Sequence, residues 1–307
     1  MRVVVVAGAR LHAGFYTVDG PWNVLWGGSG FYVEEPRVEV EAWSCGEPRL
    51  EGYSGYEDIA RLLVDRLKPS QTCLKLGKAL PRHVGLGSTT QVALASGVAV
   101  SVVEGLGLSV PRLASILGRG RYSLVGTLLF IHGGFVVDPG VPSGAARALS
   151  RLDVPGDWRF IIVIPRVGRG FSEGEEARVM EARRPSQASE YMMAKGTIML
   201  ASAVARGDLD DALEALRLVQ SGTGLYFSGI QGGVYRGDVS RIVEEASRDG
   251  IVLAQSSWGP TLYTIAHEDE AASDARLIKL ILGEAGIPGE VLVSRPRNTG
   301  AEVRRVA

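Results

Sequence analysis

Residues 81–90 read PRHVGLGSTT, and they lead directly into the small-residue run QVALASGVAV. Glycine lets a backbone approach a ligand closely, and hydroxyl side chains suit the first turn of a helix. Because the N–H groups at a helix N-terminus face one point, such a loop can bind phosphate or diphosphate. An ordinary capped helix after a turn explains the loop alone about equally well. The predicted anion-binding residues are Gly85, Leu86, Gly87, Ser88, Thr89 and Thr90.

Two residues near the N-terminus, Arg10 and His12, lie two positions apart in a predicted strand and therefore share one of its faces. Taken singly, a surface arginine and a hydrogen-bonded core histidine are the commoner interpretations. Two further loops, GRGRYS and AQSSWGP, collect more polar side chains, although each is also typical of a solvated turn. Their candidate residues are Arg119, Arg121 and Ser123 in the first loop, and Gln255, Ser256, Ser257, Trp258 and Gly259 in the second.

The segment PRVGRGFSEGEEA places two arginines, Arg166 and Arg169, ahead of three carboxylates. Arginine can bind phosphate oxygens through two parallel hydrogen bonds. Carboxylates can hold a Mg²⁺ that bridges a diphosphate, or act as a general acid or base. Acidic residues also stabilise a helix N-terminus without any catalytic role, and that interpretation stands beside the functional one. The functional interpretation assigns Glu173 to catalysis, and Ser88, Glu175 and Glu176 to a metal ion.

The composition excludes several classes of protein. The 307 residues carry a net charge of −1, which gives no basic field for nucleic acid and no polybasic membrane signal. No apolar stretch reaches the ~18 residues of a membrane span. Cys45 and Cys73 are the only cysteines, so neither a zinc site nor a disulfide framework is expected. A cytoplasmic protein is therefore predicted, and its scarcity of asparagine fits a thermophile.

Strands mixed with helices and hairpins predict an α+β fold rather than a doubly wound sheet. A hairpin is expected early in the chain, with the glycine-rich sequence GGSG at residues 27–30 as its turn. A helix is expected from Ser88 to Glu104, directly after the phosphate loop. The polar segment 153–157 marks the expected boundary between an N-terminal lobe, 1–152, and a C-terminal lobe, 153–307.

Taken together, VVVVAGARLHAGF, PxxxGLGSTT and AQSSWGPTLY resemble the three motifs of the GHMP kinase superfamily, in order and at suitable spacing. Within it, ARLHAGF, GLGSTTQVALA, GRGRYSLVGTLLFIHGGFVVDPG, SEGEEA and PRNTGAEV are similar to the archaeal β-ribofuranosylaminobenzene 5′-phosphate synthases. The resemblance covers essentially the whole chain. It implies a two-lobed α+β fold, with an N-terminal S5-like lobe, a C-terminal ferredoxin-like lobe and the site between them.

The resemblance also implies a reaction, that of a decarboxylating phosphoribosyl transferase in methanopterin-type cofactor synthesis. Such an enzyme condenses phosphoribosyl diphosphate with 4-aminobenzoate or 4-hydroxybenzoate and releases CO₂ and diphosphate. The implied cofactor is Mg²⁺ or Mn²⁺, without an organic cofactor, and the implied assembly is a homodimer. In this interpretation residues 255–259 form the substrate pocket, Arg119 and Ser123 join the loop in binding phosphate, and the catalytic residues are Arg10, His12, Arg121 and Glu173.

Two other functions stay open at this point. Many kinases of the superfamily carry an aspartate that helps to activate the attacking hydroxyl, ahead of a Gly-Gly pair. Aligning that pair with Gly133 and Gly134 puts Gly126 at the aspartate position, and glycine cannot act as a base. This argues against an ATP-dependent small-molecule kinase without excluding it. A non-catalytic metabolite-binding protein is the third interpretation, and the presence of Arg10 and His12 beside the other loops disfavours it.

Overall fold

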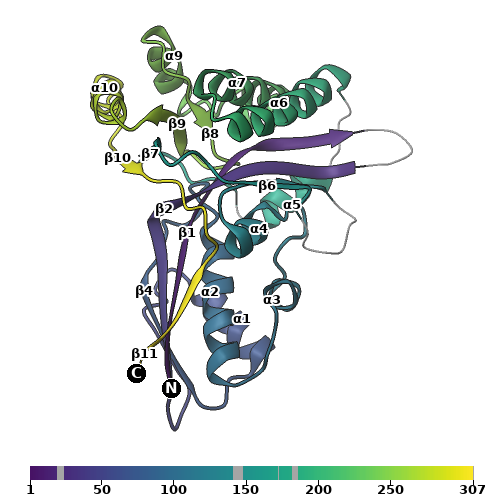
Figure 1. Ribbon diagram of the computed structural model, residues 1–307, viewed down its shortest axis with the longest axis vertical. Coiled ribbons are helices and arrows are strands. Elements are labelled where there is room, and N and C mark those ends of the chain that lie inside the picture. Colours follow the sequence, from purple (N-terminus) through teal and green to yellow (C-terminus); the bar gives the residue numbers. More distant parts are fainter. Residues whose placement is uncertain (19–23, 141–147, 172, 182–185, 307) are drawn as a thin grey trace.

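Two β-sheets form the framework of the protein (Figure 1). The structure is a computed structural model that describes residues 1–306 except 19–23, 141–147, 172 and 182–185. The first sheet has the strand order β11-β1-β2-β4-β3, and β5 joins β2 to β6. Its described strands are β1 (Arg2–Val18), β2 (Val24–Ser44), β3 (Arg49–Glu51), β4 (Thr72–Lys78), β5 (Phe135–Asp138), β6 (Ser150–Leu152) and β11 (Glu302–Val306).

The second sheet is antiparallel, with the order β10-β7-β9-β8. Its described strands are β7 (Trp158–Pro165), β8 (Ala254–Gln255), β9 (Leu262–His267) and β10 (Gly289–Ser294). The described helices are α1 (Glu57–Leu67), α2 (Ser88–Val103), α3 (Val110–Ile116), α4 (Val125–His132), α5 (Glu173–Glu181), α6 (Gln187–Arg206), α7 (Leu209–Tyr226), α8 (Ser228–Gln231), α9 (Ser240–Arg248) and α10 (Ala271–Glu284).

The expected boundary at residues 152/153 falls between β6 and β7, where the chain leaves the first sheet for the second. The last strand, β11, returns to pair antiparallel with β1, so both ends of the chain lie in the first sheet (Figure 1). The largest apolar cluster includes Val5 from the first sheet and Ile162 from the second. The two halves therefore share a core, and the division into residues 1–152 and 153–307 stays a prediction.

Helix α2 packs against β1 and β2 because small residues cover it on most sides. Ala93, Ala95 and Ala99 are fully buried, and the helix has almost no polar face. At Gly97 a β-carbon would lie 2.9 Å from the Leu117 side chain, so glycine permits the close contact with α3. This packing fixes the N-terminus of α2, which carries the candidate site, deep in the molecule.

The glycine-rich sequence at residues 27–30 does not form a turn, so that prediction is wrong. These residues lie within β2 and pair with β1, as in the register His12 opposite Gly30. A β-carbon at Gly30 would lie 2.5 Å from the Leu11 carbonyl oxygen and 2.9 Å from Val125 of α4. The glycines are therefore needed for close packing between layers and not for chain reversal. The hairpin connection itself, at residues 19–23, lies outside the described residues.

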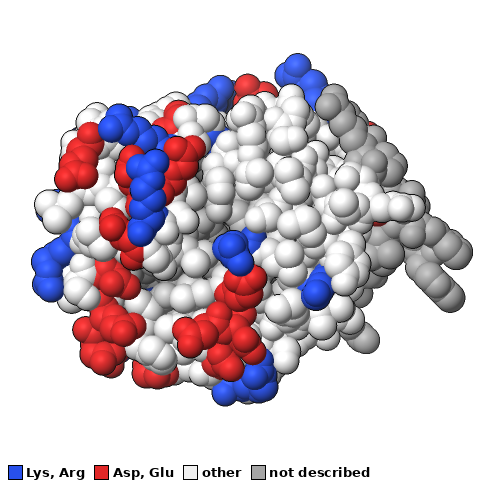
Figure 2. All heavy atoms as spheres, turned by 90° about the horizontal axis from the view of Figure 1, so that it is seen from above, with Lys and Arg blue, Asp and Glu red and all other residues white. Residues whose placement is uncertain are grey.

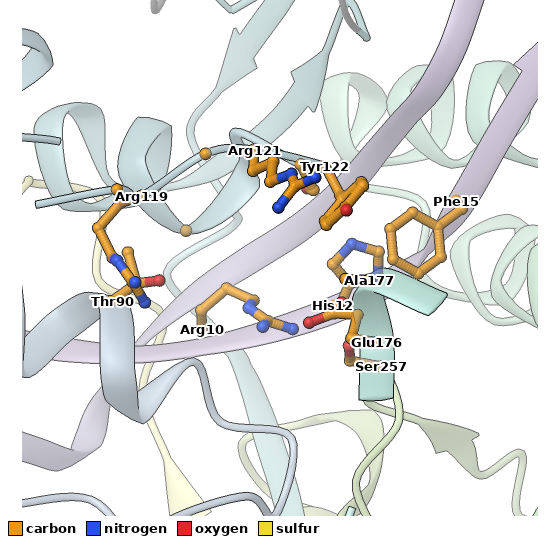
Figure 3. A pocket seen from close by; sticks show the side chains of 14 residues that line it. Arg10, His12, Phe15, Thr90, Arg119, Arg121, Tyr122, Glu176, Ala177 and Ser257 are labelled. Carbon is orange, nitrogen blue, oxygen red and sulfur yellow. The ribbon is translucent and has the colours of Figure 1, made fainter. Parts of the chain in front are cut away.

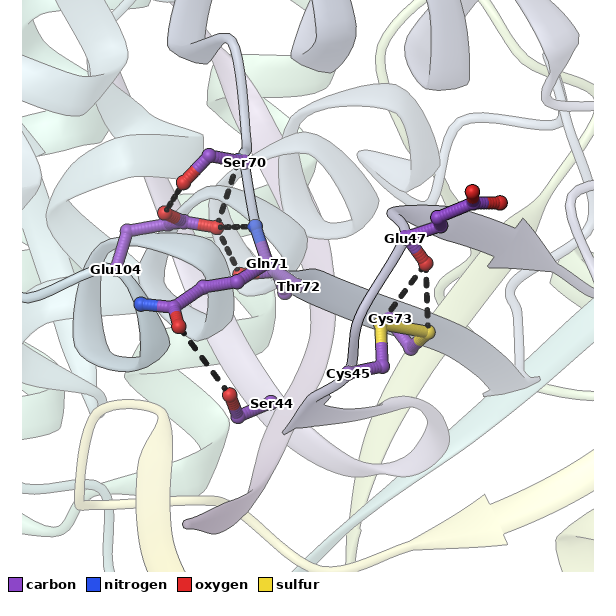
Figure 4. Close-up of a disulfide and its surroundings, with 8 residues drawn as sticks. All are labelled: Ser44, Cys45, Glu47, Ser70, Gln71, Thr72, Cys73 and Glu104. Carbon is purple, nitrogen blue, oxygen red and sulfur yellow. Dashed lines mark hydrogen bonds between the residues drawn. A yellow bond between two sulfur atoms is a disulfide. The ribbon is translucent and has the colours of Figure 1, made fainter.

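Cys45 and Cys73 form a disulfide, contrary to the expectation from their spacing (Figure 4). They are 28 positions apart in the sequence, but β2 and β4 are antiparallel neighbours, which brings their Cα atoms to 5.8 Å. Sequence spacing cannot reveal this pairing because it depends on strand register.

One carboxylate, Glu104 at the end of α2, joins this helix to the start of β4 (Figure 4). It accepts hydrogen bonds from the backbone N–H groups of Ser70 and Gln71, both at 2.9 Å, and from the hydroxyls of Ser70 and Thr72. Desolvation alone would raise the pKa of Glu104, but these hydrogen bonds together lower it below its ordinary value. The ionised carboxylate therefore stabilises the fold.

Replacing Glu104 by glutamine should lower the free energy of unfolding at pH 7 by about 2 kcal/mol, because acceptor capacity is lost where four donors converge. Since the folded pKa is lowered, this stabilisation is present above about pH 4.5 and disappears as the pH falls through the folded pKa. Urea unfolding at pH 7 and at pH 3 measures both effects. The exposed Glu244→Gln variant is the control, and an equal loss at both pH values would contradict the explanation.

The surface seen from above in Figure 1, where α9 and α10 lie, carries acidic and basic side chains side by side (Figure 2). The neighbouring part of this face is largely uncharged (Figure 2). In α9 the pair Glu245 and Arg248 is 2.6 Å apart, which illustrates the mixing. Among the described residues, no helix is both long and apolar enough to cross a membrane.

Candidate active site

The loop at residues 81–87 ends at the N-terminus of α2, where the backbone is arranged for an anion. Gly85 and Gly87 have φ angles of 100° and 71°, and Gly87 is the N-cap residue. In the first turn of α2, all of whose residues the structure describes, no side chain caps the helix and no residue is acidic. The positive end of the helix dipole is therefore not compensated by any acidic side chain of the first turn.

Three segments distant in sequence hold this loop in place, and two of them carry predicted motifs. They are β1, the 254–261 segment and the 168–171 segment. The contacts are Arg10 N–H to Leu86 O at 3.1 Å, Ser256 Oγ–H to Gly85 O at 2.7 Å, Thr261 N–H to Val84 O at 3.1 Å and Gly170 N–H to His83 O at 2.6 Å. The loop is therefore rigidly supported, as a preorganised anion site requires.

A cavity of about 110 Å³ lies over the loop, and we name it the phosphate chamber. Arg10 from β1 and Glu176 from α5 also line it. The predicted residues that line it are Arg10, Gly85, Gly87, Ser88, Thr89, Thr90, Glu176, Ser257, Trp258 and Gly259. The residues predicted to bind an anion therefore line a cavity.

An adjoining cavity of about 250 Å³, the central chamber (Figure 3), shares Arg10, Thr90, Glu176 and Ser257 with the phosphate chamber. The loop 118–123 forms one wall, and its arginines reach the same cavity as the side chains of β1. The predicted residues that line it are Arg10, His12, Thr90, Arg119, Arg121, Ser123, Glu176 and Ser257. Gly126, the position of the kinase aspartate in the alignment, also lines it.

A third cavity, the inner chamber, opens beyond His12 and is narrow, about 20 Å³. The rings of Phe15, Phe227 and Trp258 form its apolar part, and its polar lining comes mainly from α7, α8 and Gln255. Ser257 lines all three chambers and has φ of 56°, which is uncommon for a residue with a side chain. Such backbone strain is frequent at functional sites.

Arg10 stands between the phosphate chamber and the central chamber, with its guanidinium directed toward Glu176 (Figure 3). Its Nε and Nη1 atoms are buried and have no hydrogen-bond partner among the described residues. Burial lowers the pKa of Arg10 to about 10, while the nearby Glu176 opposes the shift. The side chain therefore stays cationic at neutral pH and is available to an anionic ligand.

His12 lies on the same face of β1 and is almost fully buried. Its ring lies 4.4 Å from that of Phe15, measured between centroids, and both ring nitrogens lack a partner within the described part of the chain. Burial, and to a smaller extent the charge of Arg10, holds the pKa of His12 well below its ordinary value. A neutral imidazole therefore offers one donor and one acceptor to the cavities.

Several predicted site residues have positions that differ from those expected. The Leu86 side chain is buried in the apolar core, and only its backbone belongs to the loop. Ser256 lines none of the three chambers, because its hydroxyl accepts from His12 N–H and donates to Gly85 O. Glu175 lies outside the chambers, 3.9 Å from Arg169. The side chain of Glu173 lies outside the described residues.

Arg121 reaches the central chamber but also ties its loop to α5. Its Nη2 donates to Glu181 at 3.0 Å, and Tyr122 donates to the same carboxylate at 2.9 Å. Nearby, Asp138 accepts from Leu124 N–H at 2.5 Å and from the Ser123 hydroxyl. Burial raises the pKa of Asp138 although these donors oppose the shift. Asp138 therefore anchors the start of α4, and it lines none of the three chambers.

The donor set beside the loop fits a hard divalent cation with few protein ligands. Ser88, whose hydroxyl also hydrogen-bonds to the Tyr56 phenol, and Glu176 line the same chamber. Mg²⁺ commonly combines one or two protein oxygens with water and substrate phosphates. Within the described residues, no three or more His, Cys, Asp or Glu side chains are grouped so that they could hold a metal ion. A cation at this place would therefore need ligands from water and substrate. Ser88 and Glu176, and not Glu175, are therefore the candidate ligands.

Sequence reasoning missed the residues that come from α7 and α8. Gln220, Thr223, Phe227 and Gln231 line the inner chamber and belong to no motif. Phe15 and Tyr122 lie within the recognised motifs ARLHAGF and GRGRYS and could have been included on that ground alone. His83, Gly170 and Phe171 line the phosphate chamber.

Known proteins share both the sequence pattern and the architecture. A family model described as GHMP kinases C terminal matches residues 200–278. β-Ribofuranosylphenol 5′-phosphate synthase of Archaeoglobus fulgidus is 30% identical over 316 residues, covering 96% of this chain and 97% of that protein. The chain belongs to this synthase family. A synthase of the same name from Methanothermobacter thermautotrophicus is 28% identical, with 98% of each chain covered. The predicted membership in a family of enzymes is confirmed.

Solved structures confirm the fold of this synthase-family chain. Homoserine kinase from Cytophaga hutchinsonii superposes with a TM-score of 0.69 at 19% identity, covering 99% of this chain and 97% of that one. Mevalonate diphosphate decarboxylase from Staphylococcus aureus gives a TM-score of 0.67 at 15% identity, covering 99% and 98%. At these identities the likeness concerns the fold alone, and it confirms the predicted two-lobed α+β GHMP architecture.

Proposed function

We propose that the protein joins 4-hydroxybenzoate or 4-aminobenzoate to C1 of phosphoribosyl diphosphate and releases CO₂ and diphosphate. The observation that carries the proposal is the meeting of three chambers at Ser257. One chamber lies over the glycine-rich loop, one is lined by three arginines, and one is narrow and partly aromatic. The names of the relatives, β-ribofuranosylphenol 5′-phosphate synthases, support a product that contains a phenol and a ribose 5-phosphate.

Each part of the two substrates has a chemically suitable place. The diphosphate occupies the phosphate chamber, where the N-terminus of α2 and Arg10 stabilise its charge. The ribose 5-phosphate extends into the central chamber toward Arg119 and Arg121. The benzoate ring lies beside His12 and Phe15, at the border between the central and inner chambers.

The reaction then needs only positioning and charge stabilisation. The bond from C1 to the diphosphate oxygen breaks, its electron pair leaves with diphosphate, and the ribose acquires oxocarbenium character. The ring carbon that bears the carboxylate forms a bond to C1, because the para substituent donates electron density to that carbon. The bond from the ring to the carboxylate then breaks, CO₂ leaves, and its electron pair restores the aromatic ring. Arg10 holds the departing negative charge.

Four further features belong to the proposal because the resemblance implies them. A Mg²⁺ or Mn²⁺ ion held by Ser88 and Glu176 would neutralise charge on the diphosphate when bound. A homodimer and a cytoplasmic location follow from the resemblance, as does a place in the synthesis of methanopterin-type cofactors. Light scattering of the purified protein checks the dimer, and activity after removal and return of each metal checks the cation.

The test is a turnover assay with the full chain, phosphoribosyl diphosphate, Mg²⁺ and 4-hydroxybenzoate or 4-aminobenzoate labelled at the carboxyl carbon. Labelled CO₂ released in equal amount with diphosphate is the expected result. ADP formed from ATP and a small alcohol, without CO₂, would instead indicate a kinase. Saturable binding of phosphoribosyl diphosphate without any turnover would indicate a metabolite-binding protein.

A further inference from the structure

The inner chamber has the size of one small chemical group. Its volume of about 20 Å³ is close to the 10–15 Å³ that a single water molecule requires on this measure. A benzene ring is several times larger, so the ring itself must stay outside, beside His12 and Phe15. Only a substituent of one or two heavy atoms can enter, and on a para-substituted benzoate this is the group opposite the carboxylate.

Unpaired polar atoms line this chamber. Thr223 Oγ1 and both ring nitrogens of His12 are buried without a hydrogen-bond partner among the described residues. A buried polar atom without a partner costs about 1–3 kcal/mol, so such atoms seldom persist without a function. They require a ligand group that both donates and accepts hydrogen bonds.

The glutamines of the same chamber are already engaged. Gln255 donates to Ser257 O at 2.9 Å and accepts from Arg236 N–H at 2.9 Å. Gln231 donates to Val234 O at 2.9 Å, and Gln220 accepts from Gln255 N–H at 3.1 Å. These amides build the wall, which leaves Thr223, His12 and the indole N–H of Trp258 to meet the substituent. The indole N–H is also buried without a partner among the described residues. Of these, Thr223 and His12 can each both donate and accept a hydrogen bond, whereas the indole N–H only donates.

The backbone of β1 packs closely against α7 beside Thr223. A β-carbon at Gly14 would lie 2.7 Å from Thr223 Oγ1 and 2.2 Å from the Val219 side chain. The strand and α7 therefore approach each other closely at a residue without a side chain, and Thr223 faces the cavity across this contact. Any larger residue at position 14 would collide with α7 beside the chamber.

We propose that Thr223 is the specificity-determining residue of the acceptor site, and that its hydroxyl, with the His12 imidazole, binds the para substituent of the benzoate in the inner chamber. The assignment rests on the proposed function. It also orients the ring, since the carboxylate at the opposite end then points back toward the cationic Arg10 and the reacting ribose carbon.

The experiment pairs a change in the protein with a change in the ligand. Dissociation constants of 4-hydroxybenzoate and of unsubstituted benzoate are measured by calorimetry, with Mg²⁺ and diphosphate present. The proteins are the parent, Thr223→Val, which has the same shape without the hydroxyl, and Thr223→Ser, which keeps it. Thr197→Val is the matched control, because Thr197 is also buried with an unpaired hydroxyl but lines none of the three chambers.

In Thr223→Val, 4-hydroxybenzoate should bind about 10-fold more weakly while benzoate is unaffected, and Thr223→Ser should recover most of the loss. Thr197→Val should match the parent for both ligands. Equal weakening of both ligands, or no change in Thr223→Val at an unchanged unfolding temperature, would overturn the assignment. Because this readout is binding, it separates the two proposals: a parent that discriminates the ligands but releases no CO₂ refutes only the proposed reaction.

Discussion

Methionine in place of Arg10 is expected to lower kcat/KM for phosphoribosyl diphosphate about 10³-fold, a loss typical for a transition-state charge donor. The same variant should be as stable as the parent or more stable. Arg10 is buried between two chambers, and its Nε and Nη1 lack partners in the described part of the structure. Burying a charge without full pairing costs free energy, and methionine removes that cost while filling much of the same volume.

Activity and thermal unfolding of the same preparations test this pair of effects. Arg159→Met is the matched control, because Arg159 is also buried but donates to Gly156 O and Trp158 O at 2.8 Å and pairs with Glu268. That variant should lose about 2–3 kcal/mol of stability and keep its activity. Arg10→Lys keeps the positive charge but loses the planar guanidinium, so its kcat/KM should lie between those of the parent and of Arg10→Met. If Arg10→Met unfolds earlier and stays active, Arg10 is structural.

The sequence predicts the parts of the site that local geometry determines. Gly85 and Gly87 precede a helix in a pattern whose physics is contained within ten residues, and the structure places a cavity over that loop. Arg10 and His12 share a cavity because strand periodicity alone puts them on one face. Such patterns need no knowledge of the tertiary fold.

Other features depend on contacts that no local pattern encodes. Ser256 resembles a pocket residue in sequence, but its hydroxyl is used to join β1 to the phosphate loop. Thr223 lies within an ordinary amphipathic helix, and it lines the inner chamber only because α7 packs against β1 in the tertiary fold. The same applies to the disulfide, which depends on the register of β2 and β4.

Alanine at Gly85 should reduce kcat/KM at least 100-fold, mainly through a higher KM for phosphoribosyl diphosphate, and lower the free energy of unfolding by about 2 kcal/mol. The added β-carbon would lie 2.2 Å from the Ser256 carbonyl oxygen, which belongs to backbone and cannot rotate away. Its φ of 100° is also unfavourable for alanine. The loop must therefore separate from the 254–261 segment, and its N–H groups no longer converge on the diphosphate.

Gly105, just after the C-terminal end of α2, provides the control. It separates the effect of backbone strain from the effect of displacing the loop. Gly105 also has a left-handed φ, 66°, but no atom lies within 4 Å of an added β-carbon. Gly105→Ala should therefore lower the free energy of unfolding by about 1 kcal/mol. It should leave the KM values for phosphoribosyl diphosphate and for the benzoate unchanged. Steady-state kinetics and urea unfolding of the two variants measure the difference. Equal kinetic losses at both positions would mean that strain, and not the contact of Gly85 with Ser256, determines how the loop binds its anion.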